Sequence, residues 1–84
     1  MRKTETIDLN GGMNVRKALS VFFRCAETAV DGNLTGQSVR LNSETITGDA
    51  LRTDLRDRDV LTVYPAEVAR GGVKGATQLI RIAA

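Results

Sequence analysis

A stripe of apolar residues between positions 14 and 30 constrains the fold of this chain more than any other feature. When the segment is wound as a helix, these side chains lie within about 120° of one another. They are Val15, Ala18, Leu19, Phe22, Phe23, Ala26, Ala29 and Val30. Asn14 is suited to cap the first turn, and Asp31 with Gly32 to end the last. The sequence therefore predicts one amphipathic helix over residues 14–30, which must cover a second apolar surface.

Short segments around this helix have the composition of strands, and they supply that surface. Alternating or β-branched residues occur at positions 4–9, 38–42, 44–47, 61–64 and 77–82. Asn42 and Ser43 provide a turn for a hairpin, while Leu51 and Leu55 are spaced for one helical turn over the core. We therefore predict an α+β fold in which a mixed sheet of four to five strands packs on one amphipathic helix.

The size and composition of the chain exclude several classes of protein. With 84 residues, of which 42% are apolar and 26% charged, the chain fits one small domain with one core. No apolar run reaches the length of a membrane span and the first residues are polar, so we expect a cytoplasmic protein with no membrane contact. Cys25 is the single cysteine and there is no histidine, so we expect no disulfide, metal or other cofactor. We assign no catalytic residue and predict that the protein is not an enzyme.

Charge is distributed unevenly along the chain. Residues 1–24 carry a net charge of +3, residues 25–69 a net charge of −4, and residues 70–84 a net charge of +3. Aromatic residues, which stack on bases, make up only 4% of the chain. Nucleic-acid binding through the basic, glycine-containing segment near the C-terminal end is therefore the weakest of the functions considered.

A diglycine and the segments before it resemble a known family. Residues 38–44 (SVRLNSE) and 55–65 (LRDRDVLTVYP) are followed by Arg70, Gly71 and Gly72. In this order and spacing they resemble the ubiquitin-like β-grasp sulfur carriers of thiamine and molybdopterin synthesis, over roughly residues 14–72. The resemblance implies a β-grasp fold.

The resemblance also implies a function for the diglycine. An activating enzyme would adenylate the carboxylate of Gly72, with Gly71 as its partner in a tail slim enough to enter that enzyme. Sulfur transfer would then make a thiocarboxylate for a sulfur-accepting synthase. The turn glycine of the family is replaced by Arg58, and we interpret Asp57 and Asp59 beside it as turn residues.

Two departures from the family concern the ends of the chain. Residues 73–84 follow Gly72, so activation requires their removal, and only one strand precedes the helix where the family has two. The strand at 77–82 would fill the vacant central place, either as a permuted fold with residues 66–76 as a crossover or by exchange into a strand-swapped homodimer. We thus divide the chain into a β-grasp domain at 1–72 and an extension at 73–84, either an integrated strand or a removable tail.

Two functions stay open on this evidence. The first is the sulfur carrier. The second is a non-catalytic ubiquitin-like interaction module, in which residues 77–82 join the sheet and the diglycine is a loop. In the module, the exposed sheet face with Arg40 and Thr62 would meet an acidic partner, together with the basic residues Arg70, Lys74 and Arg81.

Overall fold

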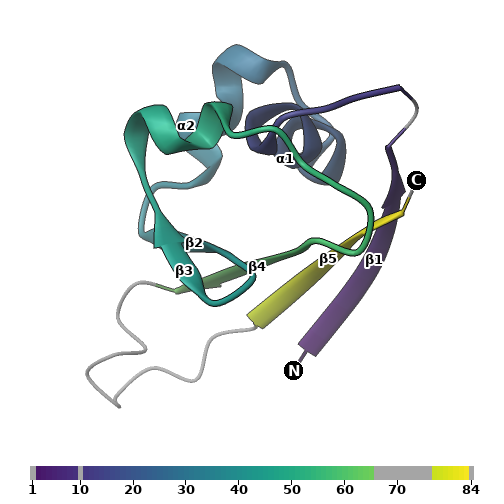
Figure 1. Ribbon diagram of the computed structural model, residues 1–84. Helices are drawn as coiled ribbons and strands as arrows, with labels where there is room; N and C mark the ends of the chain where they lie inside the picture. The colour runs from purple at the N-terminus through teal and green to yellow at the C-terminus, as the bar shows by residue number, and fades with distance from the viewer. Residues whose placement is uncertain (1, 10, 66–76, 84) are drawn as a thin grey trace.

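The helices and strands form two layers in the computed structural model, which describes residues 2–9, 11–65 and 77–83 (Figure 1). The strands are β1 (Arg2–Asp8), β2 (Gln37–Leu41), β3 (Glu44–Ile46), β4 (Val60–Pro65) and β5 (Thr77–Ala83). The helices are α1 (Val15–Phe23) and α2 (Val30–Asn33), with the 3₁₀-helices η1 (Glu27–Ala29) and η2 (Gly48–Arg52). The helices lie together on one face of a single mixed sheet, so the predicted α+β class is confirmed.

The C-terminal strand β5 lies inside the sheet, whose strand order is β1-β5-β4-β2-β3. It runs parallel to β1, with Thr77 opposite Arg2 and Ala83 opposite Asp8. On its other side it pairs with β4, where Ile80 lies opposite Leu61. The prediction that residues 77–82 form a strand between the first strand and the strand at 61–64 is therefore confirmed.

The direction of β5 corrects the predicted connection to it. A crossover through residues 66–76 would have made β5 parallel to β4, as parallel neighbours require. The two strands are antiparallel, so the crossover is wrong. Antiparallel neighbours have their joined ends at the same edge of the sheet and need only a hairpin connection. Residues 66–76 themselves lie outside the described residues.

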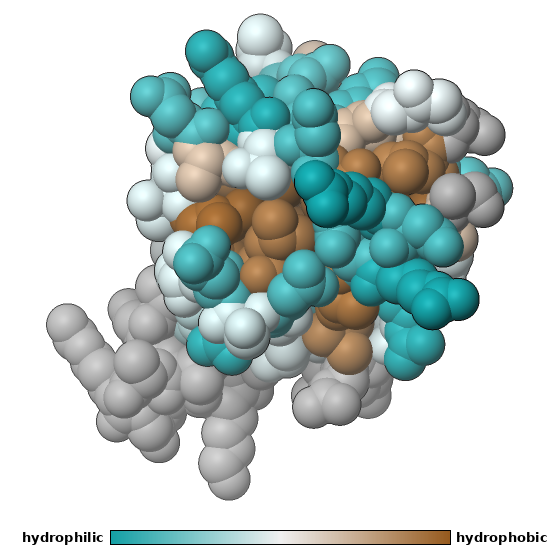
Figure 2. All heavy atoms as spheres, in the orientation of Figure 1, coloured by the Kyte–Doolittle hydropathy of each residue, from teal (hydrophilic) through white to brown (hydrophobic). Residues whose placement is uncertain are grey.

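One apolar core lies between the two layers. The strands contribute alternate residues to it, as the sequence predicts, because successive side chains of a strand point to opposite faces. The core consists of Ile7, Val15, Ala18, Leu19, Val30, Val39, Ile46, Leu51, Leu55, Leu61, Val63, Ile80 and Ile82. Figure 2 shows hydrophobic side chains in the middle of the molecule, between the helices and the strands, with hydrophilic side chains over most of the remaining surface. The two leucines predicted to cover the core, Leu51 and Leu55, are both buried. The single helical turn predicted to carry both is wrong, because η2 ends at Arg52 and Leu55 lies beyond it, where its N–H donates to the carbonyl of Met13.

The predicted helix over residues 14–30 is wrong beyond its first half. α1 ends at Phe23 because Arg24 takes a left-handed conformation, with φ 58° and ψ 47°. The backbone N–H groups of Arg24 and Cys25 both donate to the carbonyl of Ser20, which closes the helix end. The chain then continues as η1 and α2, which brings Val30 into the core but leaves Ala26 exposed. The predicted stop at Asp31 and Gly32 is also wrong, since both lie within α2.

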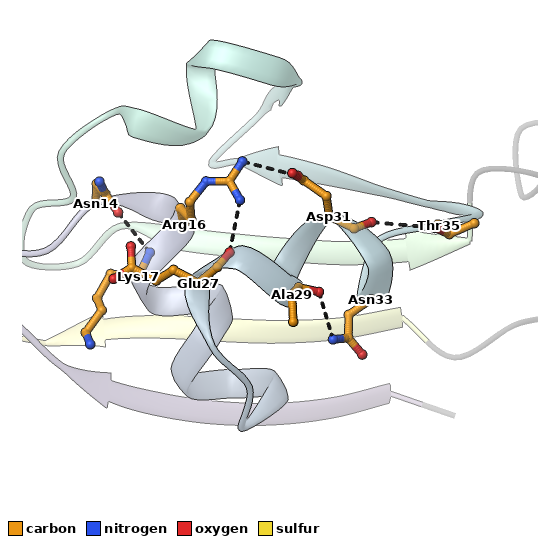
Figure 3. A network of polar contacts seen from close by, with 8 residues as sticks. All are labelled: Asn14, Arg16, Lys17, Glu27, Ala29, Asp31, Asn33 and Thr35. Atoms are coloured by element: carbon orange, nitrogen blue, oxygen red, sulfur yellow. Dashed lines mark hydrogen bonds and ion pairs between the residues drawn. The ribbon is translucent and has the colours of Figure 1, made fainter.

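Polar contacts explain how the separate helical pieces are held together (Figure 3). Asn14 caps α1 as predicted, because its side-chain oxygen accepts from the N–H of Lys17 at 2.8 Å. Arg16 reaches from α1 to the two pieces that follow it. Its Nη1 donates to the carbonyl of Glu27 and its Nη2 to Oδ1 of Asp31, both at 3.1 Å. No helix in the described ranges is long and apolar enough to cross a membrane.

Replacing Arg24 by glycine should stabilise the fold. A left-handed residue with a Cβ costs free energy that glycine avoids, so Arg24→Gly is expected to raise the free energy of unfolding by about 0.5–1 kcal/mol. Thermal unfolding followed by circular dichroism measures this. Lys17→Gly is the matched control, because Lys17 is an exposed residue within α1. Glycine at such a position lowers the free energy of unfolding by about 1 kcal/mol. A lower melting temperature for Arg24→Gly would contradict the left-handed cap.

Candidate protein-interaction surface

The sheet face opposite the helices is the candidate functional surface, which we call the open face. Its members alternate along the strands with buried core residues, so they point away from the helices. They are Thr4, Thr6, Asp8, Ser38, Arg40, Thr45, Val60, Thr62, Tyr64, Thr77, Leu79, Arg81 and Ala83. All of these side chains are exposed or half-buried, and no helix of the described ranges covers them.

The strand register places one row of the open face across the whole sheet. Thr4 lies opposite Leu79, and Leu79 opposite Thr62. Thr62 in turn pairs with Arg40, and Arg40 with Thr45. The row therefore carries three hydroxyl groups, one aliphatic side chain and one guanidinium, a mixture suited to a polar protein surface with a small apolar centre.

Tyr64 holds the guanidinium of Arg40 in place. The Cζ atom of Arg40 lies 5.3 Å from the centroid of the Tyr64 ring, which is cation–π geometry. The hydroxyl groups of Tyr64 and Thr45 are 3.4 Å apart. The hydrogen bond with Thr45 lowers the pKa of the Tyr64 phenol, and the Arg40 guanidinium lowers it further. The charged guanidinium of Arg40 thus lies over an aromatic ring, which restricts its position.

The structure brings together part of the predicted binding set. Arg40 and Thr62 are direct cross-strand neighbours on the open face. Arg70, Lys74 and the carrier-site residues Gly71 and Gly72 lie outside the described residues.

Other members of this surface were missed in the sequence. Tyr64 alternates with buried residues just as Thr62 does, so strand alternation could have found it. Leu79 needed the register between β4 and β5, which no local pattern contains.

A hollow of about 310 Å³ lies at one end of the open face. It is lined by Thr6, Asp57, Arg58, Asp59, Val60, Arg81, Ile82 and Ala83. Three of these, Thr6, Arg81 and Val60, form the second cross-strand row of the open face. The remaining wall consists of the turn that leads into β4 and the end of β5.

That turn is a bulge against the end of β5. The N–H of Arg58 donates to the carbonyl of Ile82 at 2.8 Å, and the N–H of Ile82 donates to the carbonyl of Asp59 at 2.9 Å. Two residues thus oppose one, with Arg58 at φ 75°, a position where such bulges usually have glycine. Oδ2 of Asp59 accepts from the N–H of Arg56 at 2.8 Å, which confirms Asp59 as a turn residue.

Comparison with known proteins gives no relative for this chain. A scan of family models and searches of curated proteins and of solved structures find no match. The open face and its hollow are therefore interpreted from the geometry and charge of the chain's own residues.

Proposed function

We propose that this protein is a non-catalytic interaction module of the ubiquitin-like β-grasp type, whose open face binds an acidic partner. The observation that carries the proposal is the position of β5 between β1 and β4, with its outward side chains on the open face. A strand in this place makes the C-terminal residues part of the domain and of its surface.

The order of the strands supports the β-grasp assignment. In that fold the central place lies between the strand before the helix and the last strand of the domain, which correspond here to β1 and β4. β5 occupies this place but runs antiparallel to β4, so the proposed fold is a variant with a reversed central strand. The helix layer on one face and the β2–β3 hairpin beside β4 agree with the same assignment.

The sulfur-carrier hypothesis requires the loss of residues 73–84. Their removal would take β5 out of the sheet and expose the side chains that pack against Ile80 and Ile82, which are both buried. It would also leave β1 without its strand neighbour. For this reason we favour the module, in which the diglycine is a loop and the terminal carboxylate of Gly72 is not needed.

The charges of the open face favour an acidic partner. Arg40 and Arg81 are both exposed there, against one carboxylate among the described residues of this face, Asp8, and no carboxylate of the described residues forms an ion pair with either arginine. Leu79 lies in the row between β1 and β4 and offers a half-buried apolar contact. An extended segment with alternating acidic and aliphatic residues matches this arrangement.

Binding of an acidic probe peptide tests the proposal. A fluorescent peptide of alternating glutamate and valine is expected to bind the full chain, and a peptide with glutamine in place of glutamate is not. Arg40→Gln should weaken binding by about 0.2–1 kcal/mol, the usual contribution of an exposed ion pair. Fluorescence anisotropy measures the affinity, with Arg52→Gln as control because Arg52 is an exposed arginine of η2 in the helix layer.

Equal binding of the two peptides, or equal loss in the Arg40→Gln and Arg52→Gln variants, would contradict an acidic partner on this face. Nuclear magnetic resonance of the labelled protein would locate the contact directly. Shifts confined to the helix layer would also count against the proposal.

A further inference from the structure

We infer that the hollow between Arg58 and Arg81 binds a single carboxylate side chain of the acidic partner, an inference that rests on the proposed function. It names the anchor point of the open face and the chemical group that the anchor recognises. The site consists of the hollow itself and two arginines on different elements, one of which has an unusual backbone conformation.

The two arginines line the hollow from separate parts of the fold. Arg81 extends from β5 on the open face, and within the described residues no hydrogen bond or ion pair engages its side chain. Arg58 extends from the bulge, and its side chain is 93% exposed. Guanidinium groups bind carboxylates through paired N–H donors, so two of them beside one hollow form a recognition site for that group.

Two carboxylates, Asp57 and Asp59, share the lining of the hollow with the two guanidinium groups. Oδ2 of Asp59 accepts from the backbone of Arg56, and its Oδ1 accepts from Nδ2 of Asn42 at 3.2 Å. Oδ2 of Asp57 lies 3.8 Å from Nε of Arg58. Both carboxylates therefore have partners at the turn, whereas the guanidinium of Arg81 forms no ion pair with any carboxylate of the described residues.

The backbone at Arg58 points to a role for its side chain. At φ 75° a residue with a Cβ is strained, and glycine would adopt the same conformation without strain. Strain of this kind is found at helix ends such as Arg24, and it clusters at active sites, ligand clamps and switch regions. An arginine at this position places a guanidinium at the rim of the hollow, where glycine would supply no side-chain donor.

The size and lining of the hollow fit a whole acidic side chain. Its volume of about 310 Å³ has room for roughly ten water molecules at about 30 Å³ each. That is more than one carboxylate needs, and it accommodates the methylene groups of a glutamate as well. Val60 and Ala83 provide apolar contacts for those groups, and the hydroxyl of Thr6 is a further donor.

A titration with a minimal ligand tests this site. The labelled full chain is titrated with N-acetylglutamate amide, and N-acetylglutamine amide serves as the matched uncharged ligand. We expect amide shifts at Thr6, Arg58 and Arg81 with the glutamate compound only. Arg81→Gln and Arg58→Gln should each weaken binding about threefold to fivefold.

Arg58→Gly separates binding from folding. It should weaken binding as Arg58→Gln does, but its melting temperature should rise because the left-handed strain is relieved. Arg52→Gln should change neither quantity. Equal shifts with both ligands, or unchanged affinity in Arg58→Gly and Arg81→Gln, would overturn the site.

The result also distinguishes this site from the wider proposal. If the glutamate compound fails but the acidic peptide still binds in a way that depends on Arg40, the anchor is wrong and the interaction module stands. If the glutamate compound binds in the hollow but the peptide does not bind the open face, the carboxylate site stands and the module is wrong.

Discussion

Deleting residues 73–84 is expected to abolish the cooperative folding of this protein. β5 contributes Ile80 and Ile82 to the core, and the side chain of Ile80 is fully buried at 0% exposure. Burial of each isoleucine stabilises a fold by about 1.5–3 kcal/mol, and the backbone pairing with two neighbouring strands is lost as well. Because small domains have only about 5–15 kcal/mol of total stability, the truncated chain should not retain its native sheet.

Far-ultraviolet circular dichroism during heating and the dispersion of amide resonances measure this loss. The control is a full-length chain with Thr77→Ser and Arg81→Gln, which changes outward residues of β5 but leaves its apolar row intact. This control should unfold cooperatively near the melting temperature of the unchanged protein. A truncated chain that keeps its melting temperature would contradict the integrated strand and would favour the disposable tail of a carrier.

Leu19→Ala is expected to have the largest effect of any single substitution in the helix layer. Leu19 lies in α1 with 0% exposure, surrounded by the core residues of the sheet and of the other helical pieces. Truncation of a buried leucine removes apolar contacts and leaves a cavity, which costs about 2–5 kcal/mol. Urea unfolding should therefore show a much lower midpoint.

Val21→Ala is the matched control on the same helix. Val21 is 45% exposed, and alanine has the higher helix propensity, so this change should leave stability unchanged or slightly higher. If both substitutions cost the same free energy, the helix would present a different face to the sheet from the one described.

Most of the fold could be predicted from local patterns. The strand alternation that buries Leu61 and Val63 and the turn that buries Leu51 follow from residue spacing. The helix boundary could not be predicted from spacing alone. The apolar stripe continues past Arg24, but a left-handed residue there and the contacts of Arg16 divide it into separate pieces. In this segment the tertiary contacts, and not the helical spacing of the apolar residues, set where the helix ends.

Less of the candidate site than of the fold could be predicted from the sequence. Arg40 and Thr62 were predicted because each lies on an outward position of a strand, and they are neighbours in the sheet. The hollow was missed because Arg58 and Arg81 come together only through the pairing of the bulge with the end of β5. The position of Arg58, where the similar family has a glycine, identified the turn in the sequence. It did not identify β5 as the strand that pairs with this turn.

The α+β class, the cap at Asn14 and the faces that the strands bury follow from the amino-acid sequence, because all of these depend on residue type and spacing over a few positions. The direction of β5, antiparallel to β4 and parallel to β1, is known from the three-dimensional structure and not from local sequence. Strand direction and register depend on hydrogen bonds between distant segments, and the alternation of side chains is the same in either direction. The grouping of Arg81 with Arg58 on one surface follows from that direction.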